Sequence, residues 1–382
     1  MVRQLWRNPT FRQTVVLAGL AAVVAVIFHN IGANLAQRGL SLSFEFLGRP
    51  ASFDVPFTLI EFSTRDTYAR AAFVALLNTL LVSALAIVTA TVVGVAFGTF
   101  LLSPNPLLRR TAFGFVEFIK NTPQLLQLLF WYVVILSQLP SARESYQPLP
   151  GVFLNVRGLF LPKWRLALPE PATWASEIAI LGAVLLALIG IATPFVPRKA
   201  GGWRRAIAAA ALLAGALALW TASGAALSAT YPELRGFNFK GGVQIVPELI
   251  ALWIGLAIYA SSFIADMVRG AVLAVPKGQE EAAYALGLHH AQTLWLIKLP
   301  QALRIVVPPL VSQYLNITKS STLGIAIAYP EIMTVVGGTT LNQTGHAIEA
   351  MLIIMVVFII INLAVSLLMN RYNRTVALRG SV

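Results

Sequence analysis

The sequence predicts an all-α polytopic membrane protein with about eight transmembrane helices, and three observations support this prediction. The first is composition: 57% of the 382 residues are hydrophobic and only 11% are charged, which is too apolar for a domain in water. The second is a set of apolar stretches of about 20 residues, the length that crosses a bilayer. The third is that Lys and Arg gather in the short segments between alternate stretches. The predicted spans are 14–31, 72–102, 116–137, 176–196, 206–228, 248–274, 303–322 and 347–369.

The net charge of +13 is explained by the orientation of the chain. Most of the 28 Lys and Arg residues lie in inner segments if both termini are cytoplasmic, so we expect no nucleic-acid partner. Arg3, Arg7 and Arg12 precede the first span, as in a signal peptide, but the apolar run continues to Phe28 without a small-residue cleavage site, which favours a retained anchor. The chain has no cysteine, which excludes a disulfide framework and thiolate metal sites.

Polar residues in the span from 72 to 102 need partners, because hydrocarbon offers none. Asn78 and Thr79 are therefore candidates for a substrate pathway, with helix packing as the alternative. Gly94 and Gly98 are spaced for close contact with another helix, and packing is the preferred interpretation for both.

Pro123 interrupts the span from 116 to 137 and should bend or break the helix, because it removes a backbone donor. The freed carbonyl groups need protein or water nearby, so this helix should face the interior. Gln124 and Gln127 follow the break and are further pathway candidates.

Charged residues stand in two later spans. Lys319 would cost about 2.5–3.5 kcal/mol at the centre of a span, so it should have a partner. Asp266 is one possible partner, although a local pair with Arg269 is preferred. Lys319 could also reach the outer surface or contact a substrate carboxylate. Lys319, Asp266 and Asn316, which lies one turn before Lys319, are pathway candidates as well.

A short cytoplasmic helix is predicted around residue 281. Glu280 and Glu281 follow Pro276 and put negative charge into the first turn, where the helix dipole favours it. The small residues Ala282 and Ala283 keep the helix slim, and Gly287 can adopt the left-handed conformation that ends it. Such a helix lets another protein approach closely, whereas the plainer alternative is an ordinary loop helix.

The spacing of these residues is specific. Glu281, Ala282, Ala283 and Gly287, followed by Ile297, Leu299 and Pro300, resemble the cytoplasmic coupling segment of the permease subunits of bacterial ABC importers. The flanking runs 265–270 and 275–279, the pair Thr122-Pro123, and Lys319 with Ser321-Thr322-Leu323 are similar to the polar amino acid uptake subfamily, which includes general L-amino acid and glutamine/histidine-type permeases. The Ser-Thr order departs from the Thr-Ser that is commoner there.

The resemblance implies a five-helix transport core with additions. We expect an N-terminal span and outer loop at 1–70, the first part of the core at 71–139, an inserted outer loop and two-helix hairpin at 140–246, and the second part of the core at 247–370. The last part contains the coupling segment, residues 279–300, and a cytoplasmic tail follows at 371–382. The implied location is the bacterial inner membrane, and the implied partners are ABC ATPase subunits, a second identical or different permease subunit, and a periplasmic or outer-face amino-acid-binding protein.

Catalytic motifs are missing from the sequence. It contains no Gly-Lys dipeptide and hence no P-loop, so ATP would be hydrolysed by partner subunits and no cofactor is expected in this chain. It has no His-Glu-x-x-His motif, and no catalytic or metal-binding residues are predicted. An ion-gradient-driven secondary transporter or channel for a small polar solute, with Asp266 and Lys319 as a relay, is the rival interpretation, which the coupling segment disfavours.

Overall fold

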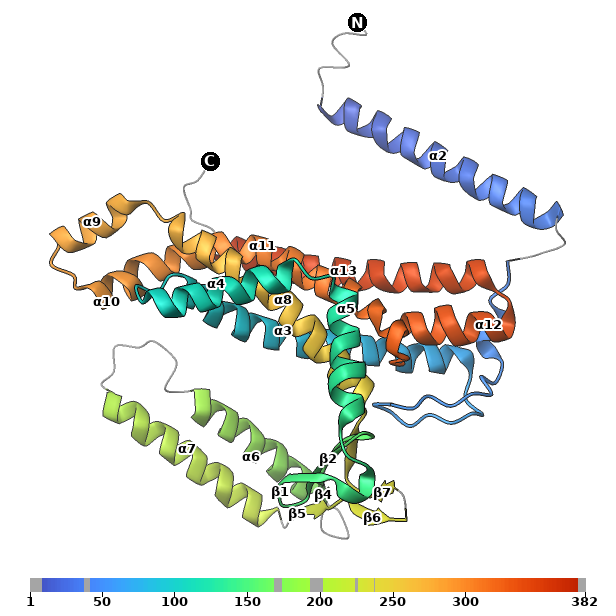
Figure 1. The fold of residues 1–382 in the computed structure, drawn as a ribbon, viewed down its shortest axis with the longest axis horizontal. Coiled ribbons are helices and arrows are strands. Elements are labelled where there is room, and N and C mark those ends of the chain that lie inside the picture. Colours follow the sequence, from blue (N-terminus) through green and yellow to red (C-terminus); the bar gives the residue numbers. More distant parts are fainter. Residues whose placement is uncertain are drawn as a thin grey trace, which may run out of the picture. The chain divides into compact units, whose positions relative to one another are not determined.

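The computed structural model describes residues 9–37, 42–167, 174–192, 202–223, 226–236 and 238–376. The chain divides into two compact units (Figure 1). The first unit comprises Met1–Leu129 and Ala251–Val382, and the second comprises Phe130–Ile250. The described part of the chain is predominantly helical, as the sequence predicts.

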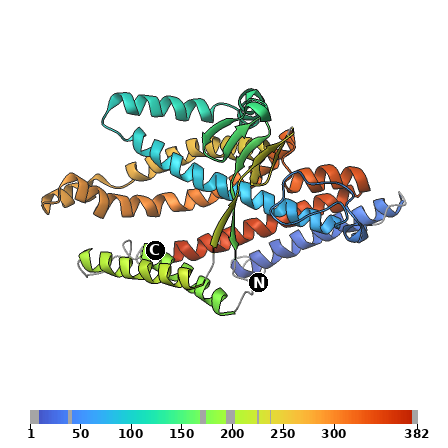
Figure 2. The same ribbon diagram turned by 90° about the horizontal axis from the view of Figure 1, so that it is seen from below.

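The first unit is built from long apolar helices. In both views α3, α8, α11 and α13 run side by side, with α9 and α10 at one end of the bundle and α12 at the other (Figures 1 and 2). The α-helices that lie mainly in this unit are α2 (Pro9–Gln37), α3 (Tyr68–Leu101), α4 (Pro106–Lys120), α5 (Gln124–Leu129), α8 (Pro247–Leu273), α9 (Lys277–Ala285), α10 (His290–Gln292), α11 (Leu299–Ser320), α12 (Leu341–Thr344) and α13 (Ala347–Val376). Shorter 3-10 or π-helical pieces are η1 (Glu45–Gly48), η6 (Thr293–Lys298), η7 (Ser321–Ile327) and η8 (Met333–Thr340).

Four helices among the described residues are long and apolar enough to cross a membrane: Tyr68–Leu101, Pro247–Leu273, Thr293–Ile327 and Ala347–Leu367. The other predicted spans overlap helices, which are α2, α4 with α5, α6 (Trp174–Ala192) and α7 (Gly202–Ala222). The described apolar parts of α2, of the α5 region and of α7 are shorter than a full span. The total of eight spans therefore stays a prediction.

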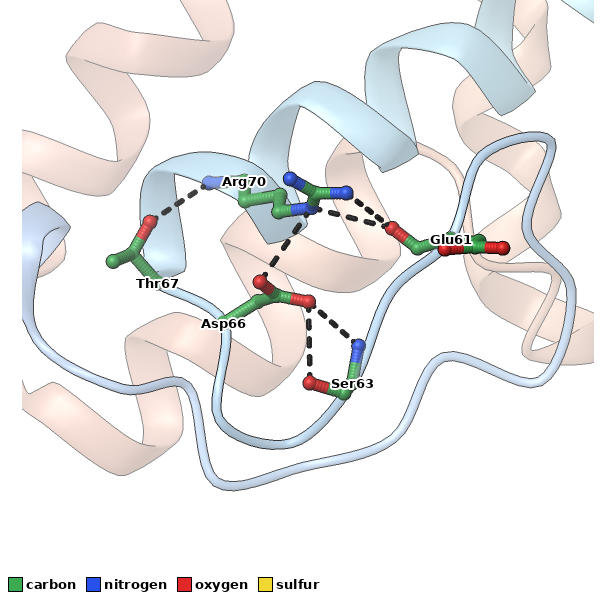
Figure 3. A network of polar contacts seen from close by, with 5 residues as sticks. All are labelled: Glu61, Ser63, Asp66, Thr67 and Arg70. Carbon is green, nitrogen blue, oxygen red and sulfur yellow. Dashed lines mark hydrogen bonds and ion pairs between the residues drawn. The ribbon is translucent and has the colours of Figure 1, made fainter.

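The start of α3 is fixed by side chains from the loop before it (Figure 3). The Thr67 hydroxyl accepts the Arg70 backbone N–H and caps the helix. The Arg70 guanidinium donates to the Glu61 carbonyl oxygen at 2.6 and 3.2 Å and lies 3.6 Å from Asp66. Asp66 in turn accepts the backbone N–H of Ser63 at 2.7 Å. The loop is thus tied to the first turn of α3.

Gly94 and Gly98 pack α3 closely against α8, which confirms the packing interpretation. A Cβ added at Gly94 would lie 2.6 Å from the Ile264 Cβ, and one at Gly98 would lie 2.7 Å from the Val268 Cβ. Real Cβ atoms do not come so close to another carbon, so a side chain at either position would push the two helices apart.

The break at Pro123 is confirmed. Helix α4 ends at Lys120 and α5 begins at Gln124, with Pro123 between them. The predicted span begins at residue 116, whereas the helix α4 begins earlier, at Pro106. Asn105 caps that end by accepting the Leu107 N–H at 2.9 Å, and Pro106 occupies the first turn, where its missing N–H costs nothing.

The second unit contains short strands, so the all-α expectation is wrong for this part. A four-stranded antiparallel sheet has the order β1-β2-β3-β8, and β4 pairs with β5 and β6 with β7. The strands are β1 (Tyr146–Leu149), β2 (Val152–Asn155), β3 (Gly158–Leu161), β4 (Lys163–Ala167), β5 (Ala226–Thr230), β6 (Glu233–Arg235), β7 (Asn238–Lys240) and β8 (Val243–Ile245). The short helical pieces η2 (Phe130–Ile135), η3 (Leu136–Gln138) and η4 (Ala142–Glu144) precede them.

These strands are only three to five residues long, and the stretch 140–174 is rich in Pro, Trp and Arg, a composition that suggests a loop. They fold because aromatic side chains give them a small core: the ring of Phe239 lies 4.7 Å from those of both Phe153 and Phe160, tilted by 34° to each. Helices α6 (Trp174–Ala192) and α7 (Gly202–Ala222) pack against each other in the same unit, as expected of a hairpin.

Candidate functional site

Helix α9 has the two ends that the sequence predicts. Glu280 lies in its first turn, and Gly287 adopts a φ of +80° just beyond its last turn. The Gly287 N–H donates to the Tyr284 carbonyl oxygen at 2.9 Å, and the Leu288 N–H donates to the Ala283 carbonyl oxygen at 3.1 Å. These bonds satisfy carbonyl groups that the helix end leaves free. The prediction of a left-handed glycine at this position is confirmed.

One side of α9 is exposed. Glu281 and Ala282 are exposed, while Ala283 is buried. A Cβ added at Gly287 would find no atom within 4 Å, and Leu286 beside it is 82% exposed. Pro300 is exposed too and stands in the first turn of α11. Leu286 and Gly287 thus form an exposed tip on a short, slim helix.

The first turn of α9 is joined to the end of η6 by an ion pair. The Lys298 Nζ lies 2.6 Å from the Glu280 Oε2, and each side chain is only 25% exposed. The Tyr284 hydroxyl donates to the Glu280 Oε1 at 3.1 Å. Lys298, followed by Tyr284, holds the pKa of the Glu280 carboxyl below its usual value, so this carboxyl is ionised at neutral pH.

The histidines beside α9 have structural partners. His289 caps α10 by accepting the Gln292 N–H, while the Gln292 side chain accepts the His289 N–H. The His290 Nδ1 lies 3.1 Å from the Tyr284 hydroxyl. In the described residues, no group of three His, Asp or Glu side chains is arranged to hold a metal ion.

The pathway candidates Asn78 and Thr79 are fully buried and bind backbone groups. The Asn78 Nδ2 donates to the carbonyl oxygens of Phe57 and Pro330, both at 2.9 Å. The Thr79 hydroxyl accepts the Ile332 N–H at 3.1 Å. These contacts tie α3 to the loop before it and to the turn before η8. The geometry therefore favours packing, the alternative to a pathway role for both residues.

Gln127 binds backbone groups at the break between α4 and α5. It is buried, and its Nε2 donates to the carbonyl oxygens of Ile119 at 2.8 Å and Thr122 at 3.1 Å. It thus satisfies carbonyl groups next to the interruption at Pro123, as the burial of a broken helix requires. Gln124 is half-buried in the first turn of α5.

Asp266 pairs with Lys120, so the expected partners Arg269 and Lys319 are both wrong. The Lys120 Nζ lies 2.5 Å from the Asp266 Oδ2 and 3.1 Å from the Glu117 Oε1. Lys120 is the last residue of α4, where the negative end of the helix dipole also favours a cation. The ion pair joins α4 to α8.

Asn316 and Lys319 lie on the exposed face of α11, together with Ser312. Their spacing of four and three residues places them one above another on one side of the helix. None of the three side chains has a hydrogen-bond or ion partner within the described residues. The structure thus brings Asn316 and Lys319 together and separates them from Asn78 and Thr79, which face the interior.

Sequence reasoning missed the partners Lys120 and Lys298 and the buried carboxylate Glu331. Lys120 and Lys298 carried a readable signal, because each is a basic residue at or beside an apolar stretch and so needs an acidic partner. Glu331 accepts the N–H groups of Met333 at 2.8 Å and Thr334 at 2.7 Å, at the start of η8.

The family and the relatives that match this chain are all described as transport proteins. Residues 90–378 match the family described as binding-protein-dependent transport system inner membrane component. YhdX of Escherichia coli (strain K12), named as a putative amino-acid ABC transporter permease protein, is 44% identical, with 97% of this chain and 95% of that protein covered. The general L-amino acid transport system permease protein AapQ of Rhizobium johnstonii is 40% identical, with 96% and 92% covered.

A third relative is the glutamate/glutamine/aspartate/asparagine transport system permease protein BztB of Rhodobacter capsulatus. It is 34% identical over 98% of this chain and 94% of its own length. All three similarities extend through the second unit, so its strands and hairpin align with residues present in these relatives.

Proposed function

This chain belongs to the family of inner membrane components of binding-protein-dependent transport systems, and on that premise we propose that it is the permease subunit of an ATP-driven amino acid importer. The substrate class rests on the names of its relatives, which are amino acid permeases. The partners would be ABC ATPase subunits, a second permease subunit and an outer-face amino-acid-binding protein. The chain would lie in the inner membrane with both termini in the cytoplasm.

The shape of α9 carries this proposal. Its exposed tip at Leu286 and Gly287 offers a slim surface that fits a groove on a partner. The helix is connected directly to α8 at one end and through α10 and η6 to α11 at the other. A push from an ATPase on α9 would therefore reach two candidate membrane spans and alternate access to the pathway as a rigid-body movement.

The exposed face of α11 supports a location for that pathway. Ser312, Asn316 and Lys319 have no partner in the described residues and lie on a helix long and apolar enough to span the membrane. Polar side chains of this kind are not left against lipid tails, so this face would line water or meet the second permease subunit. Lys319 would be the group that attracts a substrate carboxylate.

Gln124 would contribute to the same pathway, whereas Asn78, Thr79, Gln127 and Asp266 would act by holding the helices that surround it. The segment 140–246 would be an insertion into the five-helix core.

Amino acid uptake by cells carrying Gly287→Asp tests the proposed function. Because Asp tolerates a positive φ better than most residues and no neighbouring atom obstructs it, the variant should reach the membrane. It adds bulk and negative charge to the exposed tip of α9, so ATP-coupled uptake should be lost. Gly287→Asn is the matched control, since it adds the same bulk without the charge.

Two results would contradict the proposed function. One is uptake at the wild-type rate in both Gly287 variants, since the exposed tip of α9 would then have no coupling role. The other is amino acid transport by the purified chain in liposomes under an ion gradient alone, which would identify a secondary transporter.

Cysteine accessibility tests the proposed pathway, because the chain has no cysteine of its own. Asn316→Cys should react with a membrane-impermeant maleimide. Val92→Cys is the control: Val92 is an exposed apolar residue at a similar level, since its neighbour Thr91 binds the Tyr314 hydroxyl on α11 at 2.9 Å. Equal failure of both cysteines to react would place Asn316 against lipid.

A further inference from the structure

We propose that Glu280 and Lys298 are positioning residues that close the coupling segment into one rigid piece, so that a displacement of α9 is delivered to α11. This inference rests on the proposed function, because it assumes that α9 receives force from an ATPase. It concerns residues that the spacing pattern of the segment does not include.

The contacts connect every part of the segment. Glu280 lies in the first turn of α9 and Lys298 at the end of η6, 18 residues further along the chain. The two Glu280 oxygens have separate partners, Lys298 at 2.6 Å and the Tyr284 hydroxyl at 3.1 Å. Tyr284 stands in the last turn of α9 and also lies 3.1 Å from the His290 Nδ1 in α10. Four side chains thus link α9, α10 and η6.

Side-chain hydrogen bonds offer little alternative to this connection. Pro276 and Gly287 bracket α9, and both ends are points at which a helix can pivot. The other side-chain bond described between α9 and α11 joins Gln279 and Gln301 at 3.2 Å, and it is exposed to competition from water. Without the ion pair, α9 would rotate about Pro276 and Gly287, and a displacement of α9 would not reach α11.

The pair is suited to this task because it is shielded. Both side chains are 25% exposed, so water weakens their attraction less than it weakens that of a fully exposed pair. Lys298 directly precedes α11, and the ammonium therefore holds the base of the helix that would move.

The first test measures rigidity without an ATPase. Spin labels at Leu286→Cys and Leu303→Cys, both exposed positions, report the distance between the tip of α9 and α11 in the full chain in lipid nanodiscs. We expect a narrow distance distribution in the wild-type background and a broad one in Lys298→Met and Glu280→Gln. Equally narrow distributions in all three would overturn the proposed role of the Glu280–Lys298 pair, which we call the clamp, whatever the outcome of the Gly287 experiment.

The second test measures coupling in the complete transporter with its ATPase subunits and binding protein. Glu280→Lys and Lys298→Glu should each lower the amount of amino acid transported per ATP hydrolysed by about fivefold or more, because each opposes like charges, and the double reversal should recover part of that loss. Reversal of the exposed pair Glu233–Arg235 in the second unit is the control and should change nothing.

The outcomes separate the clamp from the proposed function. Recovery in the double reversal supports the clamp, since a residue needed only for contact with the ATPase would not be rescued by its partner. Wild-type transport per ATP in the single reversals would overturn the clamp, and the proposed function would still be judged by Gly287→Asp.

Discussion

A methyl group added at Gly94 should destabilise the contact between α3 and α8. The new Cβ would lie 2.6 Å from the Cβ and Cγ2 of Ile264 and 2.9 Å from the Ser261 carbonyl oxygen. Carbon atoms normally stay about 3.5–4.0 Å apart, so the overlap is about 1 Å. Ile264 is fully buried and its Cβ is fixed to the backbone, so the helices themselves must separate. Overpacking of this kind costs about 1–3 kcal/mol.

The gain in helix propensity from glycine to alanine has to be removed from the measurement. Gly114→Ala in α4 is the control, because a Cβ there meets no atom within 4 Å. The two variants gain similar propensity, and the difference between them is the packing cost. The midpoint of thermal unfolding in detergent should be lower for Gly94→Ala than for Gly114→Ala, and equal midpoints would refute the argument. Gly94→Ala with Gly98→Ala should cost less than the sum, since one separation of α3 from α8 relieves both.

Three further predictions follow from buried or paired polar groups. Asn78→Ala should lower the free energy of unfolding by about 1–3 kcal/mol for each of the two carbonyl groups that lose their donor, measured by thermal unfolding. Lys120→Met should destabilise the protein by leaving Asp266 unpaired, and adding Asp266→Asn should restore stability in a double-mutant cycle; no coupling between the two would contradict the ion pair. Glu331 lies between two candidate spans, and burial raises the pKa of its carboxyl from 4.5 to about 7. The free energy of unfolding should therefore fall as pH rises from about 4.5 to about 7, because the folded protein holds this proton more tightly than the unfolded chain. In Glu331→Gln the free energy of unfolding should depend less on pH.

The sequence predicts well those features that depend on neighbouring residues. The break at Pro123 and the left-handed Gly287 follow from what one residue can do with its own backbone. Asn105 followed by Pro106 is a typical start of a helix and indicates where α4 begins. The predicted span begins at residue 116 because the apolar run, and not this pair, sets its boundary. The strands could not be predicted, since segments of three to five residues carry too little periodicity.

Partners across the fold are beyond sequence reasoning of this kind. The local rule favours Asp266 with Arg269, three residues away, but the ion pair forms with Lys120, 146 residues earlier. Asn78 binds the carbonyl oxygen of Pro330, which is 252 residues away. The sequence shows that such polar groups need partners, whereas only the packing of α3, α4 and α8 shows which partners they have.

The polar residues of the candidate spans form two groups, one buried and one exposed, and the two groups indicate different roles. Asn78 and Thr79 are fully buried and form hydrogen bonds to backbone groups of the same chain, so they hold the fold together. Ser312, Asn316 and Lys319 are exposed and have no partner among the described residues. A lysine alone against lipid costs about 2.5–3.5 kcal/mol, and nothing within the described chain offsets that cost. If the proposed function is right, the exposed face of α11 meets water or a second subunit within the membrane, and the exposed tip of α9 meets a protein outside it.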